Sequence, residues 1–64
     1  MRVNGKDMAL DAPCSLQAFL EKEGYNTERV VVERNREIIV REKFSETMLS
    51  DEDRLEIVHF VGGG

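Results

Sequence analysis

Sixty-four residues make one small domain at most, and a single cysteine excludes an internal disulfide, so stability has to come from a core built by the 41% of hydrophobic residues. The formal net charge of −4 argues against nucleic-acid binding, because phosphate contacts need clustered lysines and arginines. No apolar run approaches the roughly 20 residues that cross a bilayer, and no signal peptide precedes the first predicted strand, so we expect a cytoplasmic protein without a membrane partner.

The N-terminal segment predicts a β-hairpin. Val3 precedes Asn4 and Gly5, the strongest short turn signal, because both central residues of such a turn adopt positive φ. Met8 and Leu10 then alternate with polar or small residues, which predicts a second strand that continues toward residue 11.

A helix of about ten residues is predicted next. Ser15 stands where an N-cap belongs, since its hydroxyl can accept a hydrogen bond from a backbone N–H of the first turn. Leu16, Phe19 and Leu20 follow at helical spacing and form one buried stripe. Gly24 suits the left-handed residue that ends a helix.

The middle of the chain predicts two antiparallel strands. Residues 30–32 are three valines, a run that suggests a strand covered on both faces, or nearly so. Asn35 and Arg36 look like a two-residue turn, and because an arginine adopts positive φ less readily than a glycine, we expect either strain or a longer loop there. Residues 37–40 return as the next strand, and residues 41–50 suggest a turn or two of 3₁₀ or α structure.

The last strand predicts one buried and one exposed row of side chains. An acidic turn over residues 51–53 precedes it, and we expect these carboxylates to be solvated, since a calcium loop would need more alternating oxygen ligands and a glycine. Leu55 and Ile57 are expected in the core. Val58 and Phe60 then project from the opposite face, either as scattered surface residues or as part of a docking patch.

The sequence ends in three glycines, Gly62, Gly63 and Gly64. Glycine has no Cβ, so three in a row can lie extended in a channel too narrow for side chains. Three residues reach roughly 10 Å, enough to hold a carboxylate away from the domain. We therefore divide the chain into a domain over residues 1–61 and a flexible tail over residues 62–64. On its own, the tail also fits a frayed terminus, the commoner interpretation.

The element order indicates an α+β fold: two strands, a helix, two strands, a short turn and a final strand. We expect a two-layer architecture in which one helix covers one face of a mixed sheet of four to five strands. The last strand is expected beside the first, in parallel, at the centre of the sheet. This is the β-grasp, or ubiquitin-like, arrangement.

Over nearly its whole length the sequence resembles the sulfur carrier family of thiamine biosynthesis. The resemblance is carried by VNGK at residues 3–6, VERN at residues 32–35 and, most specifically, DRLEIVHFVGGG at residues 53–64. The chain departs from many relatives at Asn35-Arg36 and at Glu52, where glycines are common. Both positions belong to loops away from the tail.

The resemblance implies a mechanism in which the chain is the substrate of other proteins. An ATP-dependent adenylating enzyme, similar to ubiquitin-activating enzymes, would thread Gly62 and Gly63 into its site and adenylate the carboxylate of Gly64. Sulfur from cysteine, passed on by a cysteine desulfurase, would replace AMP and give a thiocarboxylate, which then supplies sulfur to thiazole synthase. No cofactor is expected on the carrier, since the ATP is used by the partner. Val58, Phe60 and Val61 are the expected partner contacts, because a few apolar anchors dominate such interfaces.

Other functions stay open at this stage. Cys14 and His59 are the one nucleophile–base combination of an enzyme, but each is better explained as a structural residue, so we expect no catalytic residue, no metal site and no enzyme activity. A β-grasp binding module with an inert tail is a second alternative. The third keeps the carboxylate chemistry but delivers sulfur to another pathway, such as molybdopterin or an amino acid, or attaches the chain to protein lysines.

Overall fold

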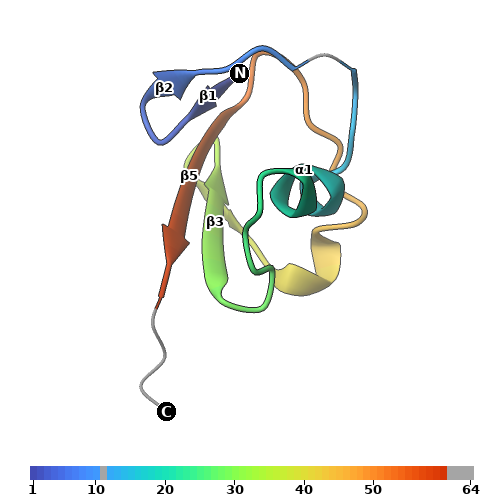
Figure 1. Cartoon of the computed structure of the whole chain (residues 1–64), viewed down its shortest axis with the longest axis vertical. Coiled ribbons are helices and arrows are strands. Elements are labelled where there is room, and N and C mark those ends of the chain that lie inside the picture. The colour runs from blue at the N-terminus through green and yellow to red at the C-terminus, as the bar shows by residue number, and fades with distance from the viewer. Residues whose placement is uncertain (11, 61–64) are drawn as a thin grey trace.

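A five-stranded mixed sheet packs on one helix in the computed structural model, which describes residues 1–10 and 12–60 (Figure 1). The elements in chain order are β1 (Arg2–Val3), β2 (Lys6–Asp7), α1 (Leu16–Lys22), β3 (Val30–Arg34), β4 (Glu37–Ile39), the 3₁₀ helix η1 (Arg41–Lys43) and β5 (Arg54–His59). The strand order is β2-β1-β5-β3-β4, with β5 parallel to β1 and antiparallel to β3. The predicted α+β, β-grasp architecture and the central position of the last strand are confirmed.

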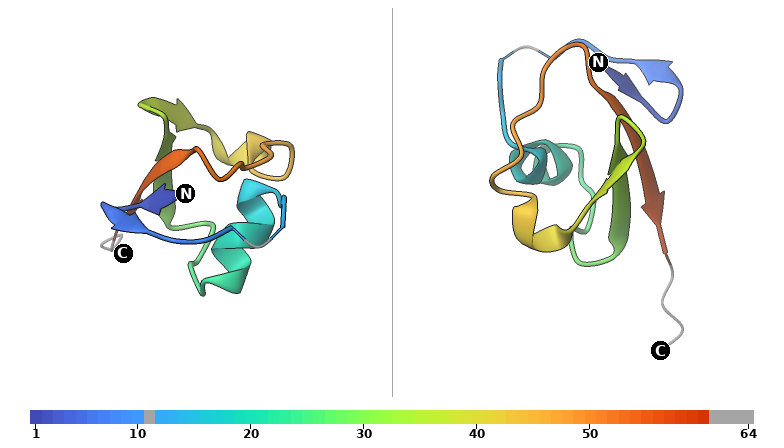
Figure 2. Two further views of the ribbon diagram at one scale, coloured as in Figure 1. Left: turned by 90° about the horizontal axis from the view of Figure 1, so that it is seen from above. Right: turned by 180° about the vertical axis from the view of Figure 1, so that it is seen from behind.

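The core lies between the sheet and α1. Helix α1 and the segment from η1 to the start of β5 lie on the same side of the sheet, and they leave its other face open (Figure 2). The buried hydrophobic residues are Met1, Val3, Leu16, Phe19, Leu20, Val30, Val32, Phe44, Leu49, Leu55 and Ile57. An antiparallel or mixed sheet can be stable in water with only one face buried. The open face is therefore available for contacts with other molecules.

Helix α1 begins and ends where its capping residues indicate. The Ala18 N–H donates to the Ser15 hydroxyl at 3.0 Å, and Leu16, Phe19 and Leu20 are buried as predicted. Gly24 has a φ of +85°, and the Tyr25 N–H donates to the Leu20 carbonyl at 2.9 Å, a Schellman C-terminus. The helix is seven residues long and not about ten, because the predicted length included the capping residues.

The N-terminal hairpin has the predicted two-residue turn but a shorter second strand. Asn4 and Gly5 have φ values of 51° and 82°, and Val3 pairs with Lys6 across them. The prediction that β2 continues toward residue 11 was wrong, since the strand ends at Asp7. Met8 still donates its N–H to the Met1 carbonyl at 2.8 Å and packs partly buried against the core, which explains the alternation in the sequence.

The β3–β4 hairpin confirms the strained turn and corrects the predicted coverage of β3. Asn35 and Arg36 have positive φ values of 52° and 69°, a conformation that L-residues other than asparagine rarely adopt. Val31 is 43% exposed, so β3 is not covered on both faces. The valine run reflects β-propensity, which β-branched residues have on either face of a sheet.

Asp53 corrects the prediction that the acidic turn is solvated. Its side chain is buried and accepts hydrogen bonds from the Ser50 N–H at 2.9 Å, the Asn35 amide at 3.0 Å and the Arg34 Nε at 3.1 Å. Burial acts to raise the pKa of Asp53, but these hydrogen bonds and the charge of Arg34 outweigh it, so the pKa lies below its ordinary value. A fixed carboxylate therefore joins the β3–β4 turn to the start of β5.

Candidate functional site

Strand β5 is the platform from which the chain runs on toward the glycines. It pairs with β1 on one side and with β3 on the other, and its pairing with β3 continues to Val30 opposite His59. The Phe60 N–H extends this ladder by donating to the Arg29 carbonyl at 2.9 Å. The chain is thus held by main-chain hydrogen bonds up to Phe60, the last residue that the structure describes.

Two turn asparagines bind the main chain of β5 from opposite sides. The Asn4 side chain accepts from the Ile57 N–H at 2.7 Å and donates to the Ile57 carbonyl at 3.2 Å. The Asn35 side chain accepts from the Arg54 N–H at 3.0 Å, and the Asn35 N–H donates to the Arg54 carbonyl at 2.8 Å. Sequence reasoning missed both contacts, although asparagine at turn positions that glycine would satisfy is a signal for them.

The open face of the sheet carries an apolar zone beside the end of β5. Leu55 and Ile57 are buried, as predicted, whereas Val58 is 61% exposed and Phe60 is 45% exposed. The structure adds Val31, which lies directly opposite Val58, and the exposed Ile38 of β4. We call Val31, Ile38, Val58 and Phe60 the apolar zone. Sequence analysis missed Val31 and Ile38 because it treated β3 as covered on both faces and assigned no face to Ile38.

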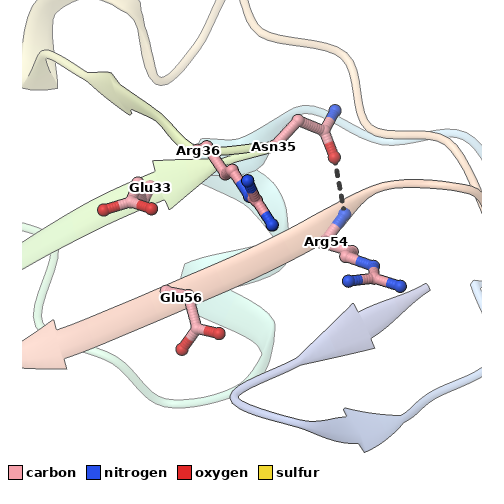
Figure 3. Close-up of a pocket in the computed structure, with 5 residues that line it drawn as sticks. All are labelled: Glu33, Asn35, Arg36, Arg54 and Glu56. Atoms are coloured by element: carbon pink, nitrogen blue, oxygen red, sulfur yellow. Dashed lines mark hydrogen bonds between the residues drawn. The ribbon is translucent and has the colours of Figure 1, made fainter.

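A charged pocket occupies the same face toward the start of β5. It is lined by Glu33, Asn35, Arg36, Arg54 and Glu56, which we call the charged zone (Figure 3). Glu33 and Glu56 are directly opposite each other in the β3–β5 register, and the Arg36 side chain extends from its turn toward β5. Sequence analysis did not identify this zone, because the residues come together only through the pairing of two strands.

Four predicted site residues lie outside the described residues, and Cys14 and His59, which the sequence analysis explained as structural residues, lie apart from this surface or at its end. Val61, Gly62, Gly63 and Gly64 lie outside the part of the chain that the structure describes. Cys14 is half-buried just before α1, where its carbonyl accepts from the Leu49 N–H at 2.9 Å, whereas His59 is exposed at the end of β5.

Residues 1–10 and 12–60 lack two features that other kinds of site would need. Among these residues, no group of three or more His, Cys, Asp or Glu side chains is placed to hold a metal ion. No helix in the same residues has the length and apolar character needed to cross a membrane. The apolar zone and the charged zone together make the open face of the sheet the candidate site.

Comparison with known proteins gives one consistent family. The ThiS family matches residues 1–64. The sulfur carrier protein ThiS of Bacillus subtilis is 43% identical over 65 residues, a match that covers 100% of this chain and 98% of that protein. The crystal structure of the thiamine biosynthesis protein ThiS from Geobacter metallireducens superimposes with a TM-score of 0.82 at 35% identity, over 98% of this chain and 96% of that one.

A second kind of relative contains a similar sequence inside a larger protein. A thiazole synthase of Paramagnetospirillum magneticum is 37% identical over 62 residues, which are 97% of this chain but 19% of the synthase. A thiazole synthase of Magnetococcus marinus is 34% identical over 64 residues, or 20% of its length. The chain thus spans about a fifth of the length of these two relatives.

Proposed function

The chain belongs to the ThiS family and is a sulfur carrier of thiamine biosynthesis, and we propose that it carries the sulfur as a thiocarboxylate on Gly64. The match to the Bacillus carrier includes Gly62, Gly63 and Gly64 of this chain, since it covers 100% of it. The domain over residues 1–61 is the handle in this proposal, and residues 62–64 are the reactive tail.

The chemistry begins with activation of a poor acyl donor. One oxygen of the Gly64 carboxylate attacks the α-phosphate of ATP in the adenylating enzyme, pyrophosphate leaves, and an acyl adenylate forms. The desulfurase holds sulfur from cysteine as a persulfide, whose terminal sulfur attacks the acyl carbon and displaces AMP to give an acyl disulfide. A thiol then cleaves the S–S bond, which releases the thiocarboxylate and leaves the thiol and the desulfurase cysteine joined in a disulfide. The carrier binds no cofactor of its own in this scheme, because the ATP belongs to the partner.

The contribution of the carrier is presentation, which fits a protein that is not an enzyme. The observation that supports this proposal best is the position of β5, which is paired on both sides and hydrogen-bonded through Phe60. A rigid base lets a partner that grips the sheet place the tail reproducibly, and positioning of this kind lowers the barrier of the partner's reaction.

The partners are proposed from two sources. The thiazole synthases that include a ThiS-like segment support thiazole synthase as the acceptor of the sulfur. The adenylating enzyme and the cysteine desulfurase follow from the chemistry that a carboxylate needs to become a thiocarboxylate. All of these reactions would take place in the cytoplasm. Val58, Phe60 and Val61 are the proposed contacts with the adenylating enzyme.

The test is adenylation of the purified chain. Incubation with ATP and the host's adenylating enzyme should add one AMP to the peptide that ends in Gly64, as seen by mass spectrometry. A variant with one alanine added after Gly64 is the matched control, since its domain is unchanged but its terminal carboxylate is displaced. AMP on both proteins, or on neither, would contradict the proposal.

A further inference from the structure

Glu33 and Glu56 form a directly opposed pair of like charges on the open face of the sheet. They are direct partners in the antiparallel β3–β5 register, a position at which like charges destabilise a sheet. Neither carboxylate takes part in an ion pair within residues 1–10 and 12–60, where the ion pairs involve other acidic residues, namely Asp51, Asp7, Asp53 and Glu46. Two arginines, Arg36 and Arg54, line the same pocket, but within these residues neither forms an ion pair with Glu33 or Glu56 (Figure 3).

The pair borders the apolar zone directly. Val31 and Val58 are opposite each other two residues further along the same two strands, and Ile38 is the partner of Glu33 on β4. Along the face, the order is therefore positive charge at Arg36 and Arg54, negative charge at Glu33 and Glu56, and then apolar side chains. An apolar centre with charges at its border is the usual composition of a protein–protein interface.

We propose that Glu33 and Glu56 receive an arginine or lysine side chain of the protein that adenylates the tail. This inference builds on the proposed function and identifies how that partner recognises the carrier. A basic side chain placed between the two carboxylates removes their repulsion and gains two charge-assisted hydrogen bonds. If the same side chain were shifted toward the start of β5, Arg36 and Arg54 would repel it. The order of charges therefore fixes the register of the partner on the sheet.

The arrangement of charged and apolar residues predicts which groups the partner's docking surface carries. Its docking surface has an apolar patch that covers Val58 and Phe60, a basic side chain at the border of that patch, and an acidic or neutral group beyond it. Because β5 joins the apolar zone to the tail, a partner seated in this register also meets the segment that follows Phe60.

The test compares two double variants with the same change in net charge. E33Q/E56Q removes the charges of the pair but keeps the size and shape of both side chains. E42Q/E52Q, at two exposed acids away from the open face, is the matched control. Affinity for the host's adenylating enzyme is measured by calorimetry at low and at high salt, and thermal unfolding is followed for each protein.

We expect E33Q/E56Q to bind about tenfold or more weakly at low salt, and its affinity should depend less on salt than that of the parent chain. The variant should also melt at a higher temperature, because the repulsion between the two carboxylates is gone. The control should bind within about twofold of the parent chain, as exposed charges outside an interface contribute little. Unchanged affinity in E33Q/E56Q, or a lower melting temperature, would overturn the inference. Adenylation of the parent chain at saturating enzyme tests the proposed function separately. The affinity of the variant tests only the role of Glu33 and Glu56 in binding.

Discussion

Two asparagines with positive φ, Asn4 and Asn35, each contribute to the fold in two ways. Asn4 and Asn35 tolerate the left-handed conformation that their turns require, and their side chains also bind the main chain of β5. Glycine would meet the first need better but could not meet the second. The residue type therefore reflects the attachment of β5 more than the turn itself.

Substitution of Asn4 separates these two contributions. We expect Asn4→Gly to lower the free energy of unfolding by about 1 kcal/mol, because it loses the side-chain hydrogen bonds to Ile57 but keeps a relaxed turn. Asn4→Ala should lower it by about 2 kcal/mol, since the alanine also carries the strain of positive φ. Urea unfolding of both variants checks the order, and a larger loss for the glycine variant would contradict it.

Asp53 predicts how stability changes in acid. Burial alone would raise its pKa, but the hydrogen bonds from Ser50, Asn35 and Arg34 lower it below the ordinary value. A carboxylate with a lowered folded-state pKa stabilises the fold above its unfolded-state pKa, and this contribution is lost as the pH falls through the folded-state pKa. The stability of the parent chain should therefore decrease below about pH 4.

The variants for this test are Asp53→Asn and, as a control in the same turn, Glu52→Gln. Asp53→Asn should be less stable at neutral pH and should lose less stability on acidification, because the titrating group is gone. Glu52→Gln should follow the parent chain, since Glu52 is exposed. Urea unfolding between pH 3 and pH 7 measures both, and parallel curves for Asp53→Asn and the parent chain would show that Asp53 is not the titrating group.

At the scale of elements, caps and turns were predicted from the sequence more accurately than the burial of side chains. The Ser15 cap, the Gly24 terminus and both two-residue turns were predicted correctly, since each depends on the conformational preference of one or two residues. The coverage of β3 and the burial of Asp53 were predicted wrongly. Both depend on what the rest of the chain places nearby: only one face of the sheet has a helix, and Arg34 and Asn35 approach Asp53 only when β3 pairs with β5.

The candidate site was predictable in part for the same reason. Alternation along the last strand predicted that Val58 and Phe60 are exposed, and the structure confirms this. Val31, Ile38 and the charged zone required the register between strands, which no local pattern specifies. The assignment of Val61 and the three glycines as site residues stays a prediction, because they lie outside the described residues.

The apolar zone makes an element-scale prediction about binding. Phe60→Ala should slow adenylation by about tenfold, because an aromatic anchor at the centre of an interface contributes more than 1 kcal/mol. Met48→Ala is the control: Met48 is 55% exposed but belongs to the segment before β5, on the other side of the sheet. Both variants should unfold like the parent chain. Equal rates for the two variants would remove Phe60 from the interface.

At the scale of the whole molecule, the proposed function combines a folded handle with a terminal glycine that other proteins modify. A single core, one helix and a central last strand account for the handle, and the net charge of −4 suits attraction to a basic partner surface. In the proposed function, the charges near the apolar zone orient the partner, and the partner supplies the chemistry of activation. The central claim of the proposed function is the sulfur on Gly64.

The most direct measurement is the intact mass and the C-terminal peptide of the chain isolated from its host under thiamine limitation. We expect a fraction of the protein in which one oxygen of Gly64 is replaced by sulfur, and the loss of this fraction when the adenylating enzyme is deleted. A Gly64 that is joined to a lysine of another protein, or that stays unmodified with the adenylating enzyme present, would contradict the account.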